Sequence, residues 1–211
     1  MSVDLLVGID VGMTGTGVAY RLMEEKEVKY LTWRGESEEK VPTRLFYGTS
    51  TSTNTSTQQP SLLAWGWDTP NTDIDRATIR EFFKTSLGSE RADQADIGRV
   101  YTDYLTCLYR DLMERRFTPS LLKGTEISLM AVRFLFSVPA TWNTAVVAMF
   151  ERFVSEAGFD RCDGHTFAVD MTEPQAVAAF QMLDPNPGVS LQDGDNVLIL
   201  DAGGGTAVTT P

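Results

Sequence analysis

Two stretches of the chain combine an apolar run, an aspartate and a cluster of glycines. "LLVGIDVGMTGTGVAY" places Asp10 and Gly12 after a β-prone run, and "VLILDAGGGTAVTT" repeats this plan with Asp201 and Gly203. Each stretch is typical of a strand, a glycine turn and a second strand. Taken alone, each is more often an ordinary β-hairpin than a ligand site.

Together the two stretches indicate a site for a phosphate chain, held from both sides by facing hairpins. Glycines let backbone N–H groups face phosphate oxygens without an intervening side chain, and a threonine hydroxyl adds a donor. An aspartate at each strand end can hold Mg²⁺ through water, because Mg²⁺ keeps most of its hydration shell. The chemistry would be phosphoryl transfer by positioning and charge neutralisation, without covalent catalysis.

Composition excludes several other classes of function. The 211 residues carry a net charge of -11, which argues against a nucleic-acid backbone or an anionic membrane as the main partner. His165 is the only histidine, so histidine-rich metal sites are excluded, and we expect no catalytic role for His165. Two cysteines, Cys107 and Cys162, favour a reduced, cytoplasmic protein. No apolar run approaches the length of a membrane span, about 18 residues.

Strand-like segments precede and separate the helix-like ones. "VDLLVGID", "VAYRLM" and "VKYLTW" predict an antiparallel meander of three strands, whose first turn holds the glycines. "MAVRFLFSVPATW" predicts a buried strand broken at Pro139, and "HTFAVDM" a short strand. This order predicts an α/β protein with a mixed sheet and flanking helices.

Three helices are expected from residue 95 onward. "ADIGRVYTDYLTCLYRDLMERRF" is the longest, and one face carries a stripe that indicates core packing. The stripe consists of Val100, Tyr104, Leu108 and Leu112. "NTAVVAMFERFVSEAGF" begins at the N-cap Asn143 and ends at Gly158. "TEPQAVAAFQML" is opened by Thr172, with Pro174 in the first turn.

The segment between the meander and the long helix is harder to interpret. Gly48–Ser61, "GTSTSTNTSTQQPS", is expected to be a flexible surface insertion. Asp75–Gly88, "DRATIREFFKTSLG", is expected to be a short helix closed by Gly88.

The joint pattern resembles the actin-like ATPase superfamily (ribonuclease H-like fold), and most of all its Hsp70-type nucleotide-binding domains. Within these it is most similar to divergent fungal Hsp70-like proteins and the animal Hsp70 member-12 type. Five stretches carry the resemblance in the family's order: "GIDVGMTGTGVAY", "EFFKTSLG", "FSVPATWN", "TEPQAVAAF" and "LDAGGGT". They span nearly the whole chain.

The resemblance implies a role for particular residues. Asp10 and Asp201 would hold the hydration shell of Mg²⁺, with Asp201 also counted among the catalytic residues. Lys84 would reach the γ-phosphate and the attacking water, and Glu173 would orient that water. The phosphates of ATP or ADP would be lined by Gly12, Met13, Thr14, Gly203, Gly204, Gly205 and Thr206.

Two positions depart from the family, and the resemblance stops early. Met13 stands where threonine is usual, and Val208 where the chaperones have an aspartate. The resemblance covers the first lobe, expected over 1–195 with an insertion-rich subdomain at about 41–92, and a truncated start of the second lobe at 196–211. A reading-frame or splice boundary near Ala207 would account for the early end of the resemblance.

The expected function is therefore binding of Mg-ATP through paired phosphate loops, with hydrolysis only in a complete, two-lobed form. Co-chaperones and client proteins are the partners that the family implies. Two alternatives stay open: a non-enzymatic interaction fragment or degenerate gene product, and a small-molecule kinase of the same superfamily.

Overall fold

The central sheet begins with a hairpin at the amino end of the chain. In the computed structural model, which describes residues 2–34, 37–48, 60–70, 77–183, 194, 198–202 and 207–210, β1 (Leu5–Val11) pairs antiparallel with β2 (Gly15–Leu22). Every second residue of β1 is buried, as expected for a strand with one face on the core. β2 continues antiparallel to β3 (Lys29–Tyr30), which confirms the predicted meander, although its third strand is short.

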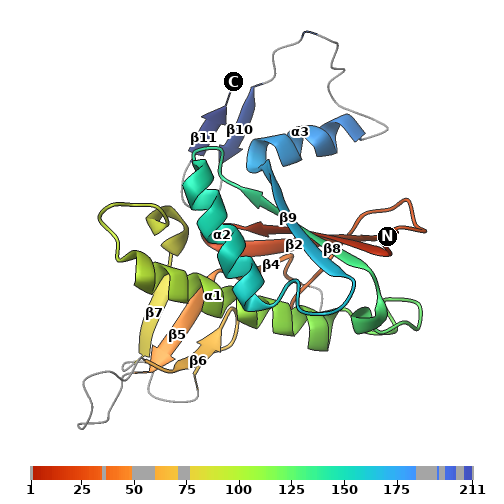
Figure 1. Ribbon diagram of the computed structural model, residues 1–211, viewed down its shortest axis with the longest axis horizontal. Helices are drawn as coiled ribbons and strands as arrows, with labels where there is room; N and C mark the ends of the chain where they lie inside the picture. Colours follow the sequence, from red (N-terminus) through yellow and green to blue (C-terminus); the bar gives the residue numbers. More distant parts are fainter. Residues whose placement is uncertain are drawn as a thin grey trace.

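Two later strands complete the sheet in parallel with β1. β8 (Val132–Val138) lies beside β1, and β9 (His165–Thr172) lies beside β8. The order is β3-β2-β1-β8-β9, and β4 (Lys40–Pro42) also pairs with β2. The predicted α/β architecture with a mixed sheet is therefore confirmed (Figure 1).

The helices begin and end close to the predicted residues. α1 (Gln94–Asp111) continues as a π-helical turn over Leu112–Arg116, and α2 (Thr144–Ala157) packs against it. The Asn143 side chain accepts a hydrogen bond from the Val146 amide, and Gly158 ends α2 with a φ of 101°. A left-handed residue of this kind is common at helix ends, where glycine carries no steric penalty. A short 3-10 turn, Ile127–Leu129, precedes β8.

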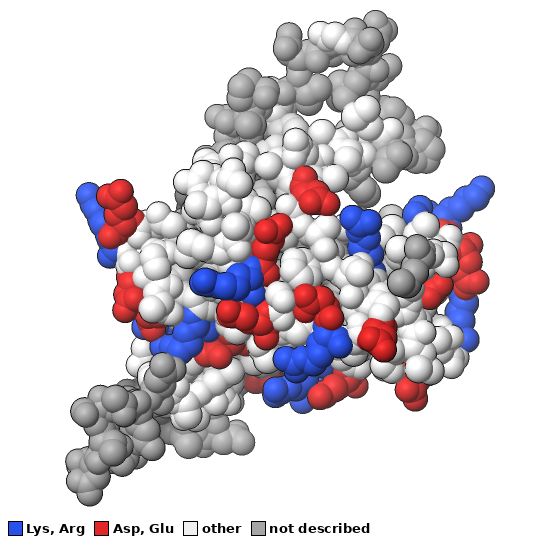
Figure 2. All heavy atoms as spheres, viewed as in Figure 1, with Lys and Arg blue, Asp and Glu red and all other residues white. Residues whose placement is uncertain are grey.

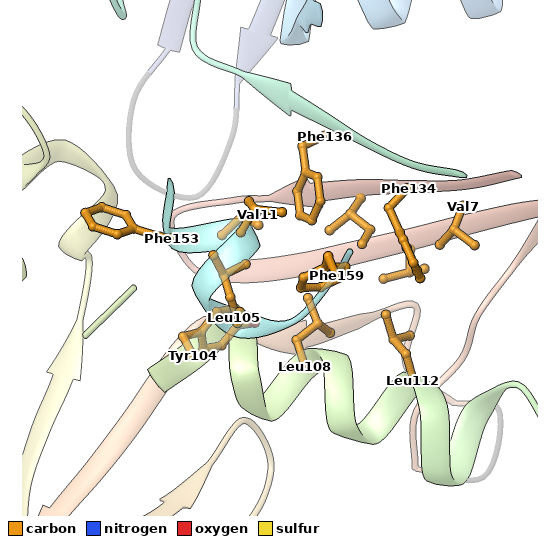
Figure 3. Close-up of a cluster of buried hydrophobic side chains, with 14 of the residues drawn as sticks. Val7, Val11, Tyr104, Leu105, Leu108, Leu112, Phe134, Phe136, Phe153 and Phe159 are labelled. Carbon is orange, nitrogen blue, oxygen red and sulfur yellow. The ribbon is translucent and has the colours of Figure 1, made fainter. Parts of the chain in front are cut away.

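The core lies between the sheet and α1. In Figure 3, Leu105 and Leu108 of α1 and Leu112 of the π-helical turn rise toward aromatic side chains of the sheet. The predicted stripe of α1 is confirmed, since all four of its side chains are 0% exposed. Phe134, Phe136 and Phe159 meet edge to face, with ring centroids 5.0 and 5.1 Å from Phe159. This arrangement is favourable for aromatic rings.

A second, smaller sheet replaces part of a predicted helix. β5 (Arg44–Gly48) is its central strand, between β6 (Leu62–Trp65) and β7 (Ala77–Glu81). The helix predicted over Asp75–Gly88 is wrong: its described part is β7 followed by a 3-10 turn, η2 (Phe83–Ser86). Ladder pairing with β5 outweighs the local helical pattern of these residues.

The carboxyl-terminal elements lie apart from the main core. α3 (Glu173–Leu183) follows β9 directly, as predicted. β10 (Ile199–Ala202) and β11 (Ala207–Thr210) form a two-stranded hairpin that contacts α3 (Figure 1). Gly203–Thr206 and most of the Gly48–Ser61 insertion, 49–59, lie outside the described residues. Across the described ranges, no helix combines the length and apolarity that crossing a membrane requires.

Candidate functional site

Three strand ends define the candidate site. β1, β8 and β9 run parallel, so their carboxyl ends lie at one edge of the sheet. Asp10 pairs with Ser137 at this edge, and Val138 pairs with Thr172 one step further along. Ligands of open α/β sheets bind outside the carboxyl ends of the strands. The fold therefore brings Asp10, the glycine turn after β1 and Glu173 to the edge where such ligands bind.

The turn between β1 and β2 is narrow because of Gly12. A Cβ atom there would lie 2.5 Å from the carbonyl oxygen of Gly15, closer than real side chains allow. The neighbouring Met13 is half-buried and Thr14 is exposed. The turn is thus closed by backbone alone, and its exposed side can admit a ligand close to the main chain.

A buried hydroxyl network fixes this turn to the rest of the protein. The Tyr104 hydroxyl, from α1, donates to Thr16 Oγ1 over 2.7 Å, and the Thr16 and Thr43 hydroxyls lie 3.0 Å apart. The Thr43 amide also donates to the Thr14 carbonyl oxygen over 3.1 Å. Since these polar groups are buried and satisfied, they hold the turn in one position.

Asp10 has a neighbour that the sequence did not reveal. Lys40 Nζ lies 3.4 Å from Asp10 Oδ2, and the two side chains are 59% and 42% exposed. Lys40 pairs with Gly17 across β2 and β4, and a Cβ atom on Gly17 would lie 3.5 Å from Lys40 Cε. Gly17 also pairs with Asp10 across β1 and β2, so the Lys40 stem crosses β2 at this residue on its way to Asp10. Because β4 has only three residues, no sequence signal pointed to Lys40.

Lys84 and Glu173 form an ion pair in the described structure. Lys84 Nζ donates to Glu173 Oε1, although 89 residues separate them in the sequence. Their side chains are only 9% and 22% exposed. Lys84 comes from η2, at the end of the smaller sheet, and Glu173 opens α3 directly after β9. The pair therefore joins the smaller sheet to the carboxyl edge of the central one.

The backbone before Lys84 is strained. Phe82 has a φ of 55°, in the left-handed region that non-glycine residues avoid at a cost of about 1–2 kcal/mol. Phe83 is buried with its ring centroid 4.9 Å from that of Tyr101 in α1. Gly88 also has a positive φ, of 77°, and lies against Val146 of α2. Packing on both helices thus holds the Lys84 segment in an otherwise unfavourable conformation.

The second predicted phosphate loop is placed only in part. Asp201 lies on β10, whose hairpin contacts α3. Gly203, Gly204, Gly205 and Thr206 lie outside the described residues. Within the described ranges no hydrogen bond joins the Lys84–Glu173 pair to Asp10. The structure therefore places the residues of the first loop and Glu173 at the carboxyl edge of the central sheet. It also places Lys84 in contact with Glu173.

His165 lies at the opposite end of β9 from Glu173. It is buried, Nε2 lies 3.1 Å from the Ile127 carbonyl oxygen, and Nδ1 lies 3.5 Å from the Tyr109 hydroxyl. Burial lowers the pKa of His165, and the bond to Ile127 opposes this effect in part. Its neighbours are those of a core histidine.

The fold is that of the actin-like ATPases. The crystal structure of MreB5 of Spiroplasma citri bound to ADP is similar over 96% of this chain, with a TM-score of 0.54 and 15% identity. Two further solved structures are similar to this chain. A non-polymerising A278D mutant of MamK bound to AMPPNP matches 82% of it, with a TM-score of 0.47 and 18% identity. S. citri MreB5 bound to AMPPNP matches 87% of it, with a TM-score of 0.49 and 12% identity.

The chain spans less than half of each of these proteins: 46% of the first MreB5 chain, 42% of MamK and 43% of the second MreB5 chain. Neither a protein-family model nor a curated protein matches the sequence. The likeness to the first MreB5 structure therefore shows the predicted fold.

Proposed function

We propose that this chain binds Mg-ATP as the first half of an actin-like ATPase fold. The observation that carries the proposal is the Lys84–Glu173 pair, since Glu173 opens α3 at the strand edge that also holds Asp10 and the Gly12 turn. An acidic group, a basic group and a glycine turn on different elements are the parts that phosphoryl transfer requires. The ADP bound in the first similar structure agrees with this proposal.

The first phosphate loop would hold the metal and the phosphates. Asp10 follows the apolar run of β1, and its side chain is 42% exposed. Its carboxylate can therefore accept hydrogen bonds from the water molecules around Mg²⁺. The close approach at Gly12 leaves no side chain between the turn and a phosphate oxygen. Mg²⁺ would neutralise charge on the phosphates. Asp201 and the second loop, Gly203–Thr206, would complete the grip from the other hairpin.

The Lys84–Glu173 pair would act at the γ-phosphate. Lys84 would share its ammonium group between Glu173 and the phosphate oxygens, and Glu173 would orient the attacking water. Hydrolysis needs the water to be held and the site to be closed, so we expect turnover to be negligible without a second lobe. The stretches "FSVPATWN" and "TEPQAVAAF" favour an Hsp70-type protein, with co-chaperones and clients, over a small-molecule kinase.

Calorimetry with Mg²⁺ and ATP tests the proposal. Asp10→Ala and Gly12→Ala should each abolish binding, the first by removing the metal contact and the second by forcing a Cβ against Gly15. Asp170→Ala is the matched control, because the Asp170 carboxylate is 77% exposed and belongs to β9, not to the β1–β2 turn. Binding that persists unchanged in both loop variants would contradict the proposal.

A second candidate is an interaction surface on α3. Within 173–182 no residue of α3 is buried, and Val177, Phe180 and Met182 are 53%, 58% and 70% exposed. Figure 2 shows the region of α3, in the upper part of the view, as largely uncharged. Exposed apolar surface of this kind marks contacts between proteins. Sedimentation of Phe180→Asp beside the wild type tests this candidate: the variant should sediment as monomer where the wild type self-associates.

A further inference from the structure

Tyr101 carries a buried hydroxyl group without a partner. It lies in the middle of α1 and is 0% exposed. Across the described part of the chain, its oxygen is the only buried side-chain N or O atom with no hydrogen bond. Buried polar groups are nearly always bonded, so such an exception needs a physical reason.

Packing does not supply that reason. Three phenylalanine rings surround the Tyr101 ring, with centroid distances of 4.9 Å to Phe83, 5.8 Å to Phe150 and 5.9 Å to Phe153. A phenylalanine at position 101 would keep these contacts and avoid burying an unpaired hydroxyl. The hydroxyl therefore destabilises the free chain and adds nothing to its core.

The surroundings connect Tyr101 to the candidate site. Phe83, whose ring lies edge to face on Tyr101, directly precedes Lys84, and Lys84 is bonded to Glu173. Burial, and after it the negative charge of Glu173, raise the pKa of Tyr101. The hydroxyl thus stays protonated at neutral pH and can act only as a neutral donor or acceptor.

We propose that Tyr101 is a positioning residue of this site, whose hydroxyl gains its hydrogen-bond partner, the water held by Glu173, when a nucleotide with a γ-phosphate binds. The inference rests on the proposed function and extends it to a residue outside the motifs. A donor that stays unpaired in the free chain and becomes paired with ligand adds directly to ligand affinity. Because Lys84 and Glu173 are assigned to the γ-phosphate, Tyr101 should favour ATP over ADP.

The test compares Tyr101→Phe with the wild type in two measurements. The first is thermal unfolding of the free chain, where the variant should melt at the same temperature or higher. The second is calorimetry with Mg-AMPPNP and Mg-ADP, where the preference for the triphosphate analogue should fall about fivefold, the value of one hydrogen bond. ADP affinity should stay unchanged.

Tyr47→Phe is the matched control. Tyr47 is also buried, and its hydroxyl donates to Asp103 Oδ2 over 2.6 Å. This variant should lower the melting temperature and leave the preference between nucleotides unchanged. Loss of the hydroxyl is therefore expected to change nucleotide preference but not lower stability at position 101, and to lower stability but not change nucleotide preference at position 47.

Three results would overturn the inference. A melting temperature of Tyr101→Phe lowered as far as that of Tyr47→Phe would show that the hydroxyl is already bonded in the free chain. An unchanged preference would show that it has no part in the site. A folded wild type that binds neither nucleotide would refute the proposed function, and the inference with it, so failure of the two is distinguishable.

Discussion

Replacing one member of the Lys84–Glu173 pair should destabilise the protein as much as replacing both. The perturbations are Lys84→Met and Glu173→Gln, which keep side-chain length while removing the charge. Each single variant leaves one charge in a site where the side chains are 9% and 22% exposed. The double variant leaves none, so its cost should not be the sum of the single costs.

The size of the effect follows from burial. Removal of one partner from a fully buried pair costs about 3–5 kcal/mol, and an exposed pair contributes about 0–1 kcal/mol. With a nearly buried lysine and a partly exposed glutamate, we expect about 2 kcal/mol for each single variant and about 2 kcal/mol for the double. The coupling free energy is then about 2 kcal/mol, within the range for residues in contact.

Urea unfolding measures this double-mutant cycle. A loss of about 2 kcal/mol moves the midpoint by about 1 M when the slope is about 2 kcal/mol/M. The control cycle uses Arg152 and Glu156, whose atoms are 3.6 Å apart and whose side chains are 63% and 50% exposed. That pair should couple by less than about 0.5 kcal/mol. Additive effects at Lys84 and Glu173 would refute the reasoning.

Three further predictions concern the core. Asp111→Ala should lower the free energy of unfolding by about 3 kcal/mol in urea titrations, because Asp111 is 4% exposed and its loss removes the carboxylate that now lies 2.7 Å from Arg116. Tyr104→Phe should lower the free energy of unfolding by about 1 kcal/mol, because it removes the hydrogen bond to Thr16. An unchanged urea midpoint would contradict a stabilising role for the hydroxyl network. The free energy of unfolding should fall from pH 7 toward pH 5.5, because burial lowers the pKa of His165 in the folded protein. The unfolded chain, in which the His165 pKa is about 6.5, therefore takes up the proton first. His165→Gln should reduce this dependence of stability on pH.

Local patterns were sufficient for the elements with strong end signals. The N-cap Asn143 and the terminal Gly158 of α2 act within one turn of the helix, so sequence alone defines its bounds. The alternation in β1 likewise predicts which face is buried. The resemblance to actin-like ATPases extended these elements to a fold, and the structural similarity agrees with it.

Long-range pairing explains what the sequence did not reveal. β7 is a strand because Arg44–Gly48 offers it a ladder, and nothing within 77–81 encodes that partner. Lys40 reaches Asp10 because β4 adds to β2, a pairing that depends on the chain between them. The motifs named Lys84 and Glu173, but their contact required the topology of both sheets. The residue roles stay predictions until nucleotide binding is measured.

The parallel pairing of β1 with β8 also has a consequence for biosynthesis. β1 can close on β2 as soon as the first hairpin has emerged from the ribosome, but its other edge waits for Val132–Val138. At about 5–20 residues per second, that delay is on the order of ten seconds. During it, a strand with Leu5, Val7 and Ile9 on one side presents an unpaired edge to other nascent chains. The yield of this protein in cells should therefore depend on the speed of translation between the two strands. Slow synonymous codons placed between β2 and β8 should increase aggregation without changing the amino-acid sequence.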